Sequence, residues 1–208
     1  MVTYSTLLDK LSKDFVLDFV YNTLSLEGNV IQKEEVEKVL NGEKVEAKHQ
    51  TLITNSLNGL NFVLQMLENN TTFDENILKD LHETIMKDVS LGGLYRNVDI
   101  SIKGSNHTPP SYLKVYDRMK KYFDSLADPN MDVWEKIAFS HLQLAKIHPF
   151  LDGNGRLARL VLNYELLLSG FKPVIIYKDQ KNKYFDLLEE FKVNKNITPF
   201  IEFLKSNQ

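Results

Sequence analysis

The sequence contains no cysteine, no basic excess and no long apolar run. Without cysteine, disulfides and thiolate metal sites are excluded. The formal net charge of −3 gives no reason to expect nucleic acid as the main partner. No apolar run is long enough to cross a bilayer, and charged residues interrupt the N-terminal stretch MVTYSTLLDKLSKDF. We therefore expect a cytoplasmic protein without nucleic-acid or membrane partners.

With those classes set aside, length and patterning favour one mostly helical domain spanning residues 1–208. A chain of 208 residues with 43% hydrophobic and 25% charged residues suits a single domain with a real core. Apolar residues recur three or four apart over most of the chain, which is typical of helices. Helix-stop and capping residues then set the ends of the segments. The predicted helices cover about 15–27, 33–40, 52–67, 72–89 with a Thr72/Glu75 capping box, 111–126, 132–147 with Asp132 and Glu135 at the start, a segment ending near Leu168 and Gly170, 181–191 and 199–205.

One segment, GGLYRNVDISIKGSNHTPP (Gly92 to Pro110), breaks the helical pattern. Its apolar residues alternate over Val98, Ile100 and Ile102, and a turn follows at Gly104. Two prolines close the segment. This pattern predicts a small β-hairpin or extended flap within an otherwise all-α fold.

The stretch HPFLDGNGRLAR, residues 148–159, combines several groups that act on phosphates. His148 ends a predicted helix, because Pro149 prevents that helix from continuing, and its imidazole can exchange protons near neutral pH. Asp152 offers a hard oxygen ligand, which suits a Mg²⁺ ion that bridges phosphates. The sequence therefore places a candidate base and a candidate metal ligand side by side.

The second half of the stretch offers anion binding. Gly153, Asn154 and Gly155 let backbone N–H groups approach a ligand where the next helix begins. Arg156 and Arg159 are three apart, so both project from one side of that helix, and their guanidinium forks match phosphate oxygens. Each residue alone fits a glycine turn with surface arginines. Their joint occurrence favours a phosphate site.

These motifs resemble the Fic family, named for filamentation induced by cyclic AMP. HPFLDGNGRLAR matches the family signature HPFx(D/E)GNGRxxR at every specified position. The Gly92–Pro110 segment looks like the family's G-x-(Y/F)-R…H-x-P-P flap, IAFSHLQLAKIHPF resembles the helix leading into the signature, and YFDLLEE…ITPFIEFL resembles the C-terminal helices. The resemblance covers nearly the whole chain.

The resemblance implies a helical bundle with a β-hairpin flap that transfers AMP from ATP, with Mg²⁺, to a hydroxyl of a protein side chain. His148 would deprotonate that hydroxyl, and Asp152 would hold Mg²⁺ on the α- and β-phosphates. The flap would align the target chain by strand-like pairing. The resemblance assigns the nucleotide to the following residues: Gly153, Asn154 and Gly155 form the anion hole, Arg156 holds phosphates of the leaving group, Arg159 holds the γ-phosphate, and Tyr184 helps to form the adenine pocket.

An upstream stretch, TLSLEGN, resembles the family's inhibitory motif (S/T)xxxE(G/N) through Thr23, Glu27 and Gly28. Its position matches the class with an N-terminal inhibitory helix (class II), here residues 12–29. In that class the glutamate pairs with the second arginine of the signature, Arg159, and takes the place that the γ-phosphate needs. The alternative is a helix end at which Glu27 is simply solvated. Within this chain the inhibitory interpretation is favoured.

The sequence thus predicts an autoinhibited protein adenylyltransferase that modifies a Ser, Thr or Tyr hydroxyl of a target protein or of itself. Two alternatives stay open: a bifunctional enzyme in which Glu27 also orients water to remove AMP, and a nucleotide-binding regulatory module with negligible turnover. A homo-oligomer is also left open. His141 is interpreted as a packed or hydrogen-bonded helix residue, and His49 and His82 have no matching ligand pair. Where many relatives have A-N-x-G-D, this chain has Phe191 to Lys195.

Overall fold

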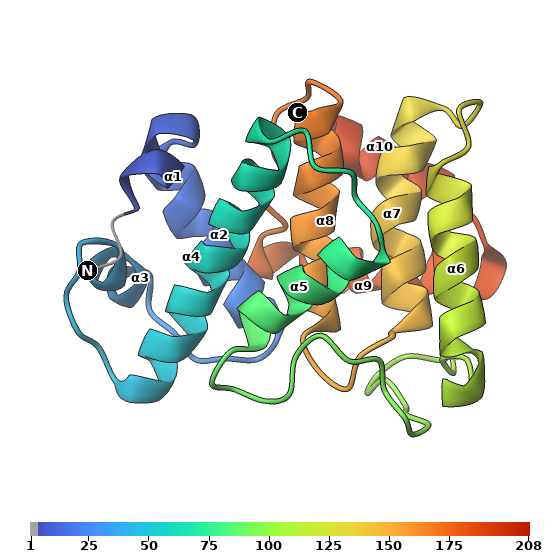
Figure 1. Cartoon of the computed structure of the whole chain (residues 1–208), viewed down its shortest axis with the longest axis horizontal. Coiled ribbons are helices and arrows are strands. Elements are labelled where there is room, and N and C mark those ends of the chain that lie inside the picture. Colours follow the sequence, from blue (N-terminus) through green and yellow to red (C-terminus); the bar gives the residue numbers. More distant parts are fainter. Residues whose placement is uncertain (1–3) are drawn as a thin grey trace.

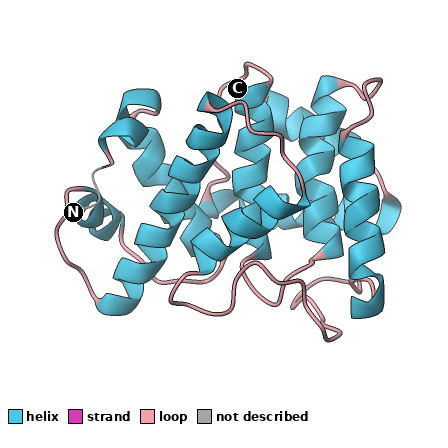
Figure 2. Ribbon diagram, in the orientation of Figure 1, coloured by secondary structure: helices cyan, strands magenta, loops and turns pink. Residues whose placement is uncertain are grey.

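The protein is built almost entirely from helices. The structure is a computed structural model that describes residues 4–208, and Figure 2 shows no β-strand in that range. Two short 3-10 turns lie at Tyr112–Lys114 and Lys178–Gln180. The α-helices are α1 (Ser5–Lys10), α2 (Lys13–Leu26), α3 (Lys33–Leu40), α4 (Ala47–Glu68), α5 (Glu75–Met86), α6 (Val115–Leu126), α7 (Val133–Ile147), α8 (Asn154–Leu168), α9 (Lys181–Glu189) and α10 (Thr198–Lys205).

Helix α8 lies at the centre of the bundle (Figure 1). It packs against α7 on one side and α4 on the other, and α5 crosses in front of its lower part. Apolar residues from Leu157 to Leu162 are buried around the whole circumference of α8, as expected for a helix inside a core. The end of α2 also contacts α8. The central position of α8 therefore brings segments far apart in the sequence to its N-terminal end.

Most helix predictions are confirmed, and their ends follow capping chemistry. Helix α3 covers Lys33–Leu40 as predicted, and Asp132 accepts hydrogen bonds from the first backbone N–H groups of α7. The predicted Thr72 cap is wrong. Asp74 caps α5 instead, because its carboxylate accepts from Ile77 N at 2.9 Å. The short α1 was not predicted. None of the helices within residues 4–208 is long and apolar enough to span a membrane.

The predicted β-hairpin is not confirmed. The segment 92–110, which we call the flap, contains no strand and follows an extended, irregular path. Its polar groups find partners outside the segment: Arg96 N donates to Pro149 O, and Asn106 N donates to the Glu189 carboxylate. An isolated two-stranded hairpin is marginal in water, so anchoring to neighbouring elements replaces cross-strand pairing here.

A second difference concerns the end of α9. The sequence predicts a helix to Phe191, whereas α9 ends at Glu189 and a π-helical turn follows over Glu190–Asn194. Lys195 closes this turn with a left-handed backbone (φ 58°). Such turns are rare in proteins overall, and those that occur are often found at functional sites. The turn carries the residues that stand where many relatives have A-N-x-G-D.

Candidate active site

The loop between α7 and α8 brings the signature residues together. His148 caps α7 in a left-handed conformation (φ 52°), and Gly153 precedes α8 with φ 76°. The side chain of Asn154 closes the loop, accepting from Phe150 N at 3.0 Å and donating to Phe150 O at 2.9 Å. Asn154 is thus a structural clamp, 1% exposed, that fixes the loop between the base and the glycines.

The imidazole of His148 is arranged to accept a proton. Its Nδ1 faces Ala145 O at 3.4 Å, which leaves Nε2 without a partner in the part of the chain that the structure describes. Burial lowers the pKa of His148 to about 4, and nearby cations add to this effect. His148 is therefore neutral near pH 7, the form that a general base needs.

Arg96, a flap residue with no role in the sequence-based prediction, organises the backbone around His148. Its guanidinium donates to His148 O and Val98 O, each at 2.9 Å, and also to Pro110 O. The side chain is fully buried. Burying a cation is costly unless hydrogen bonds compensate, and here three carbonyls do so. Arg96 therefore joins both ends of the flap to the backbone of the base.

His82 of α5 connects the flap with Asp152. Gly93 N donates to His82 Nδ1 at 2.9 Å, so Nε2 carries the proton and donates to Asp152 O at 2.9 Å. The ring stacks on Phe150 with centroids 3.6 Å apart. Burial lowers the pKa of His82 to about 4. The sequence offered no signal for this role, because 70 residues separate His82 from Asp152.

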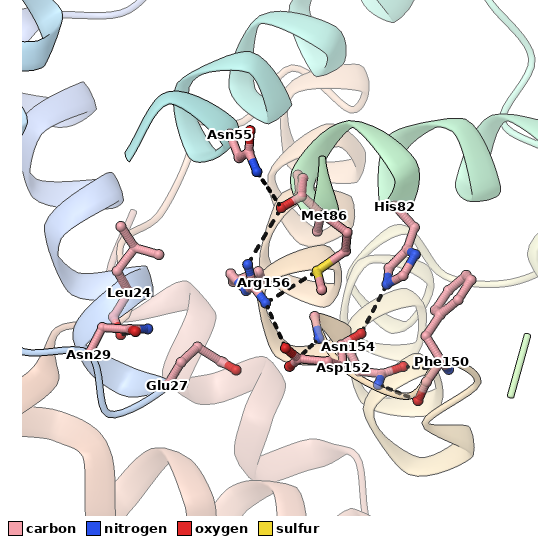
Figure 3. Close-up of polar contacts among 12 residues, drawn as sticks. Leu24, Glu27, Asn29, Asn55, His82, Met86, Phe150, Asp152, Asn154 and Arg156 are labelled. Atoms are coloured by element: carbon pink, nitrogen blue, oxygen red, sulfur yellow. Dashed lines mark hydrogen bonds and ion pairs between the residues drawn. The ribbon is translucent and has the colours of Figure 1, made fainter. Parts of the chain in front are cut away.

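The carboxylate of Asp152 is exposed at the front of the loop (Figure 3). One oxygen accepts from Gly153 N at 2.6 Å, and the other lies 3.4 Å from Arg156 Nη2. Within residues 4–208 no group of three or more His, Cys, Asp or Glu side chains gathers to hold a metal. Mg²⁺ commonly binds through one carboxylate together with nucleotide phosphates, so Asp152 fits such an ion.

Arg156 is buried but weakly held. Its guanidinium contacts Met86 Sδ at 3.3 Å, Asp152 Oδ2 at 3.4 Å and Ile85 O at 3.5 Å (Figure 3). Its Nε has no hydrogen-bond partner in the described part of the chain. A buried donor without a partner is costly, which is a common sign of a site awaiting a ligand. Arg156 is thus available to an anion in front of α8.

Arg159 is held much more firmly, by the last turn of α2. Its Nε donates to Thr23 Oγ1 at 2.5 Å, and its Nη2 donates to Thr23 O at 3.0 Å and to Glu27 Oε1 at 2.7 Å. Burial alone would lower the pKa of Arg159, but the charge of Glu27 and the interaction with Tyr184 raise it above its usual value. The predicted contact between Glu27 and Arg159 is present.

The carboxylate of Glu27 also covers the glycine turn. A Cβ added to Gly155 would lie 2.3 Å from Glu27 Oε1, so only glycine allows this close approach. Figure 3 shows the Glu27 side chain pointing toward Asp152 and Arg156. The first turn of α8 offers free N–H groups and a partial positive charge, which attract an anion. The carboxylate of Glu27 therefore lies beside Gly155 and Arg159, at this end of α8.

Tyr184 and His141 lie behind Arg159 in the core. Tyr184 is 1% exposed, and its hydroxyl lies 3.0 Å from His141 Nε2. His141 Nδ1 donates to Ala158 O at 2.9 Å, which confirms its interpretation as a hydrogen-bonded helix residue. The adenine-pocket role of Tyr184 stays a prediction. Its position supports Arg159 from behind.

Comparison with known proteins gives the geometry a context. Residues 72–166 match the model of the Fic/DOC family. The chain is 26% identical over 211 residues to "Protein adenylyltransferase Fic" of Drosophila ananassae, covering 96% of this chain and 41% of that protein. It is 28% identical over 204 residues to the protein of the same name from Nematostella vectensis, covering 92% and 47%. The chain thus spans less than half the length of these curated relatives.

Two solved structures share the fold. A Fic domain containing signaling protein from Bacteroides thetaiotaomicron superimposes with a TM-score of 0.86 at 24% identity, covering 96% of this chain and 85% of that one. Fic-1 (residues 134–508) from C. elegans superimposes with a TM-score of 0.85 at 23% identity, covering 99% and 64%. Residues 72–166 thus correspond to a Fic/DOC family domain, and the chain has an all-α Fic-like fold and is related to protein adenylyltransferase Fic.

Proposed function

We propose that this protein is an autoinhibited protein adenylyltransferase, which transfers AMP from ATP to a hydroxyl of a target protein or of itself. The observation that carries the proposal is one contact. Glu27 Oε1 lies 2.7 Å from Arg159 Nη2. Arg159 belongs to α8, and the first turn of that helix carries the other candidate phosphate-binding groups. The distant relatives named protein adenylyltransferase support the choice of reaction.

In the proposed reaction His148 acts as general base. Its neutral Nε2 takes the proton of the target hydroxyl while the hydroxyl oxygen attacks the α-phosphorus of ATP. The bond between the α-phosphorus and the bridging oxygen breaks, and pyrophosphate leaves. Free N–H groups at the start of α8 and the guanidinium of Arg156 stabilise the charge that develops on the phosphates.

Asp152 is the residue that would hold Mg²⁺ in this scheme, and the ion would supply charge neutralisation to the phosphates. Its carboxylate accepts from Gly153 N at 2.6 Å, lies 3.4 Å from Arg156 Nη2 and is more than half exposed to solvent. His82 holds the backbone of Asp152 through its carbonyl. The flap would lie beside the target chain, fixed to the base through Arg96.

Inhibition in this proposal is electrostatic. The γ-phosphate of ATP and the carboxylate of Glu27 are both anions that bind Arg159, so they compete for it. With Glu27 in place, ATP binds with its terminal phosphate elsewhere and its α-phosphorus out of line with the hydroxyl. Productive catalysis needs in-line positioning, so this displacement suppresses transfer.

The test incubates the protein with Mg²⁺ and labelled ATP, CTP, GTP or UTP, and compares wild type, Glu27→Gly and His148→Ala. Label should appear on protein from ATP, increase in Glu27→Gly and vanish in His148→Ala. Label that remains in His148→Ala would contradict the role of His148 as general base. Label that does not increase in Glu27→Gly would contradict inhibition by Glu27.

A second candidate is a nucleotide-binding module with negligible turnover. The observation that favours it is the triple anchoring of Arg159 by Thr23 and Glu27, which is strong for a contact that must open. The two candidates differ in the Glu27→Gly protein. The module predicts that this variant binds ATP more tightly yet transfers no label to protein.

A further inference from the structure

Lys192 occupies a position that helical spacing would give to an apolar residue. Tyr184, Leu188 and Lys192 are four apart and are all buried, with Lys192 only 7% exposed. Lysine is almost never fully buried unless its charge is paired. A side chain that breaks the local pattern marks a position where function competes with packing. Lys192 stands in the π-helical turn, where the chain departs from the family pattern.

The buried ammonium has one acidic partner in the described part of the chain. Lys192 Nζ lies 3.3 Å from Glu189 Oε1, and the side chains are 6% and 23% exposed. Burial lowers the pKa of Lys192, and the charge of Glu189 opposes this shift. Removing one partner of a buried ion pair leaves the other uncompensated. The two residues are therefore expected to act as a unit.

Glu189 uses the same carboxylate to hold the flap. Its Oε1 accepts from the hydroxyl of Ser105 at 2.5 Å, and its Oε2 accepts from the backbone of Asn106 at 2.9 Å. Burial would raise the pKa of Glu189, but these two bonds and Lys192 together lower it, so the carboxylate is ionised at neutral pH. Hydrogen bonds to a charged acceptor are stronger than neutral ones.

The ends of the flap and its central turn are anchored differently. Arg96 ties the two ends of the flap to the backbone of His148. The turn at Ser105 and Asn106 has its main anchor in Glu189, with His107 Nε2 also lying 3.1 Å from Lys146 O, two residues before the base. A change at the carboxylate of Glu189 would therefore release the turn and leave the backbone of His148 in place.

We propose that Glu189, held in place by Lys192, is a positioning residue that fixes the turn of the flap beside the catalytic base so that the flap can align the target chain. This inference rests on the proposed adenylyltransferase function. Because neither residue touches the phosphate-binding groups, loss of the pair changes how the target is held and leaves nucleotide binding as it was.

Amide hydrogen exchange tests the positioning without relying on activity. In Glu189→Ala, the backbone N–H of Asn106 and its neighbours in 102–107 should exchange about tenfold or more faster than in wild type, since a bond to a charged acceptor is lost. Lys192→Met should give a smaller acceleration, and Lys192→Arg should restore slow exchange. The matched control is Glu190→Ala, because Glu190 bonds Asn194 and Asn196 and not the flap.

Unchanged exchange in Glu189→Ala would overturn the proposal, as would an equal acceleration in Glu190→Ala. Should Glu189→Ala fail to fold, Ser105→Ala removes the bond to Glu189 together with the bond that Ser105 Oγ accepts from His107 N, so the readout is the N–H of Asn106, which should exchange faster. A second readout uses the Glu27→Gly background: Glu189→Ala should lower labelling of protein while the Kd for ATP stays unchanged. If no variant labels protein, the proposed function fails, and the exchange result still decides the positioning.

Discussion

Arg156 and Arg159 are three residues apart on α8, but their guanidinium groups differ in how strongly they are hydrogen-bonded. Arg159 donates three hydrogen bonds of 2.5 to 3.0 Å to the C-terminal end of α2, and the acceptor of one of them is the carboxylate of Glu27. Arg156 has contacts of 3.3 to 3.5 Å and a buried Nε without a partner among the described residues. One arginine is occupied by the protein itself, and the other is left to a ligand.

This difference teaches where binding and control lie in the site. A weakly held cation beside a glycine turn and an exposed carboxylate suits the phosphates of any nucleotide. A cation that already has a carboxylate partner accepts a second anion only if the first one leaves. On the proposed function, Arg156 would therefore bind phosphate whether or not Glu27 is in place, whereas Arg159 would bind phosphate only after Glu27 leaves.

The largest expected effect removes the chemistry and leaves both arginines in place. In the Glu27→Gly background, His148→Ala should lower the rate of label transfer by about 10²- to 10⁴-fold, the usual contribution of a general base. The Kd for ATP should change little, because His148 lies outside the phosphate contacts. A rate within a few-fold of the parent would contradict the role of His148.

The comparison between the two arginines predicts a background-dependent effect. In the Glu27→Gly protein, Arg156→Lys and Arg159→Lys should each slow transfer by about tenfold to a hundredfold, the value of a charge-assisted hydrogen bond that lysine cannot reproduce in fork geometry. In the wild-type background only Arg156→Lys should matter, since Glu27 already occupies Arg159. Equal losses in both backgrounds would break the distinction.

The occupied arginine also predicts a stability effect. Glu27→Gln should lower the free energy of unfolding by about 1.5–3 kcal/mol, because it removes a charged acceptor from a buried guanidinium. Urea denaturation without nucleotide measures this change. Glu43→Gln is the control, since that glutamate is exposed. A loss no larger than in the control would mean that Glu27 and Arg159 are not coupled.

A pH-dependent effect on stability is expected from His141. Burial is the main reason that the pKa of His141 falls from its usual 6.5 to about 4. Between pH 4 and 6.5 the unfolded chain therefore binds a proton at this residue and the folded protein does not. The resulting stability is fully present above pH 6.5, and it falls by at most about 1.4 kcal/mol per pH unit between pH 6.5 and 4. His141→Gln should flatten the dependence of unfolding free energy on pH in this range. An unchanged slope would contradict the assignment.

Much of the fold follows from local chemistry in the sequence. The helix at 33–40 and the cap at Asp132 were predictable because periodicity and capping residues lie within a few positions of each other. The flap was predicted as a hairpin because Val98, Ile100 and Ile102 alternate. Alternation shows which residues share a face but not which backbone groups pair, and here the partners lie on other elements.

The site was predictable only where its residues form one short motif. The stretch from His148 to Arg159 is continuous, so its chemistry could be predicted from the sequence alone. Glu27 lies 132 residues from Arg159, and only its resemblance to an inhibitory motif suggested the pair. His82 and Glu189 act over 70 and 83 or more residues through single hydrogen bonds, and no local pattern announces such contacts.

The central claim is that Glu27 and the γ-phosphate compete for Arg159, and ADP tests it directly because it lacks that phosphate. The Kd values of ATP and ADP with Mg²⁺ should be measured by calorimetry in the His148→Ala protein and in Glu27→Gly/His148→Ala, neither of which is expected to consume the nucleotide. Removing Glu27 should tighten ATP by about tenfold or more and leave ADP within a few-fold. An equal change for both nucleotides, or none for ATP, would contradict the account.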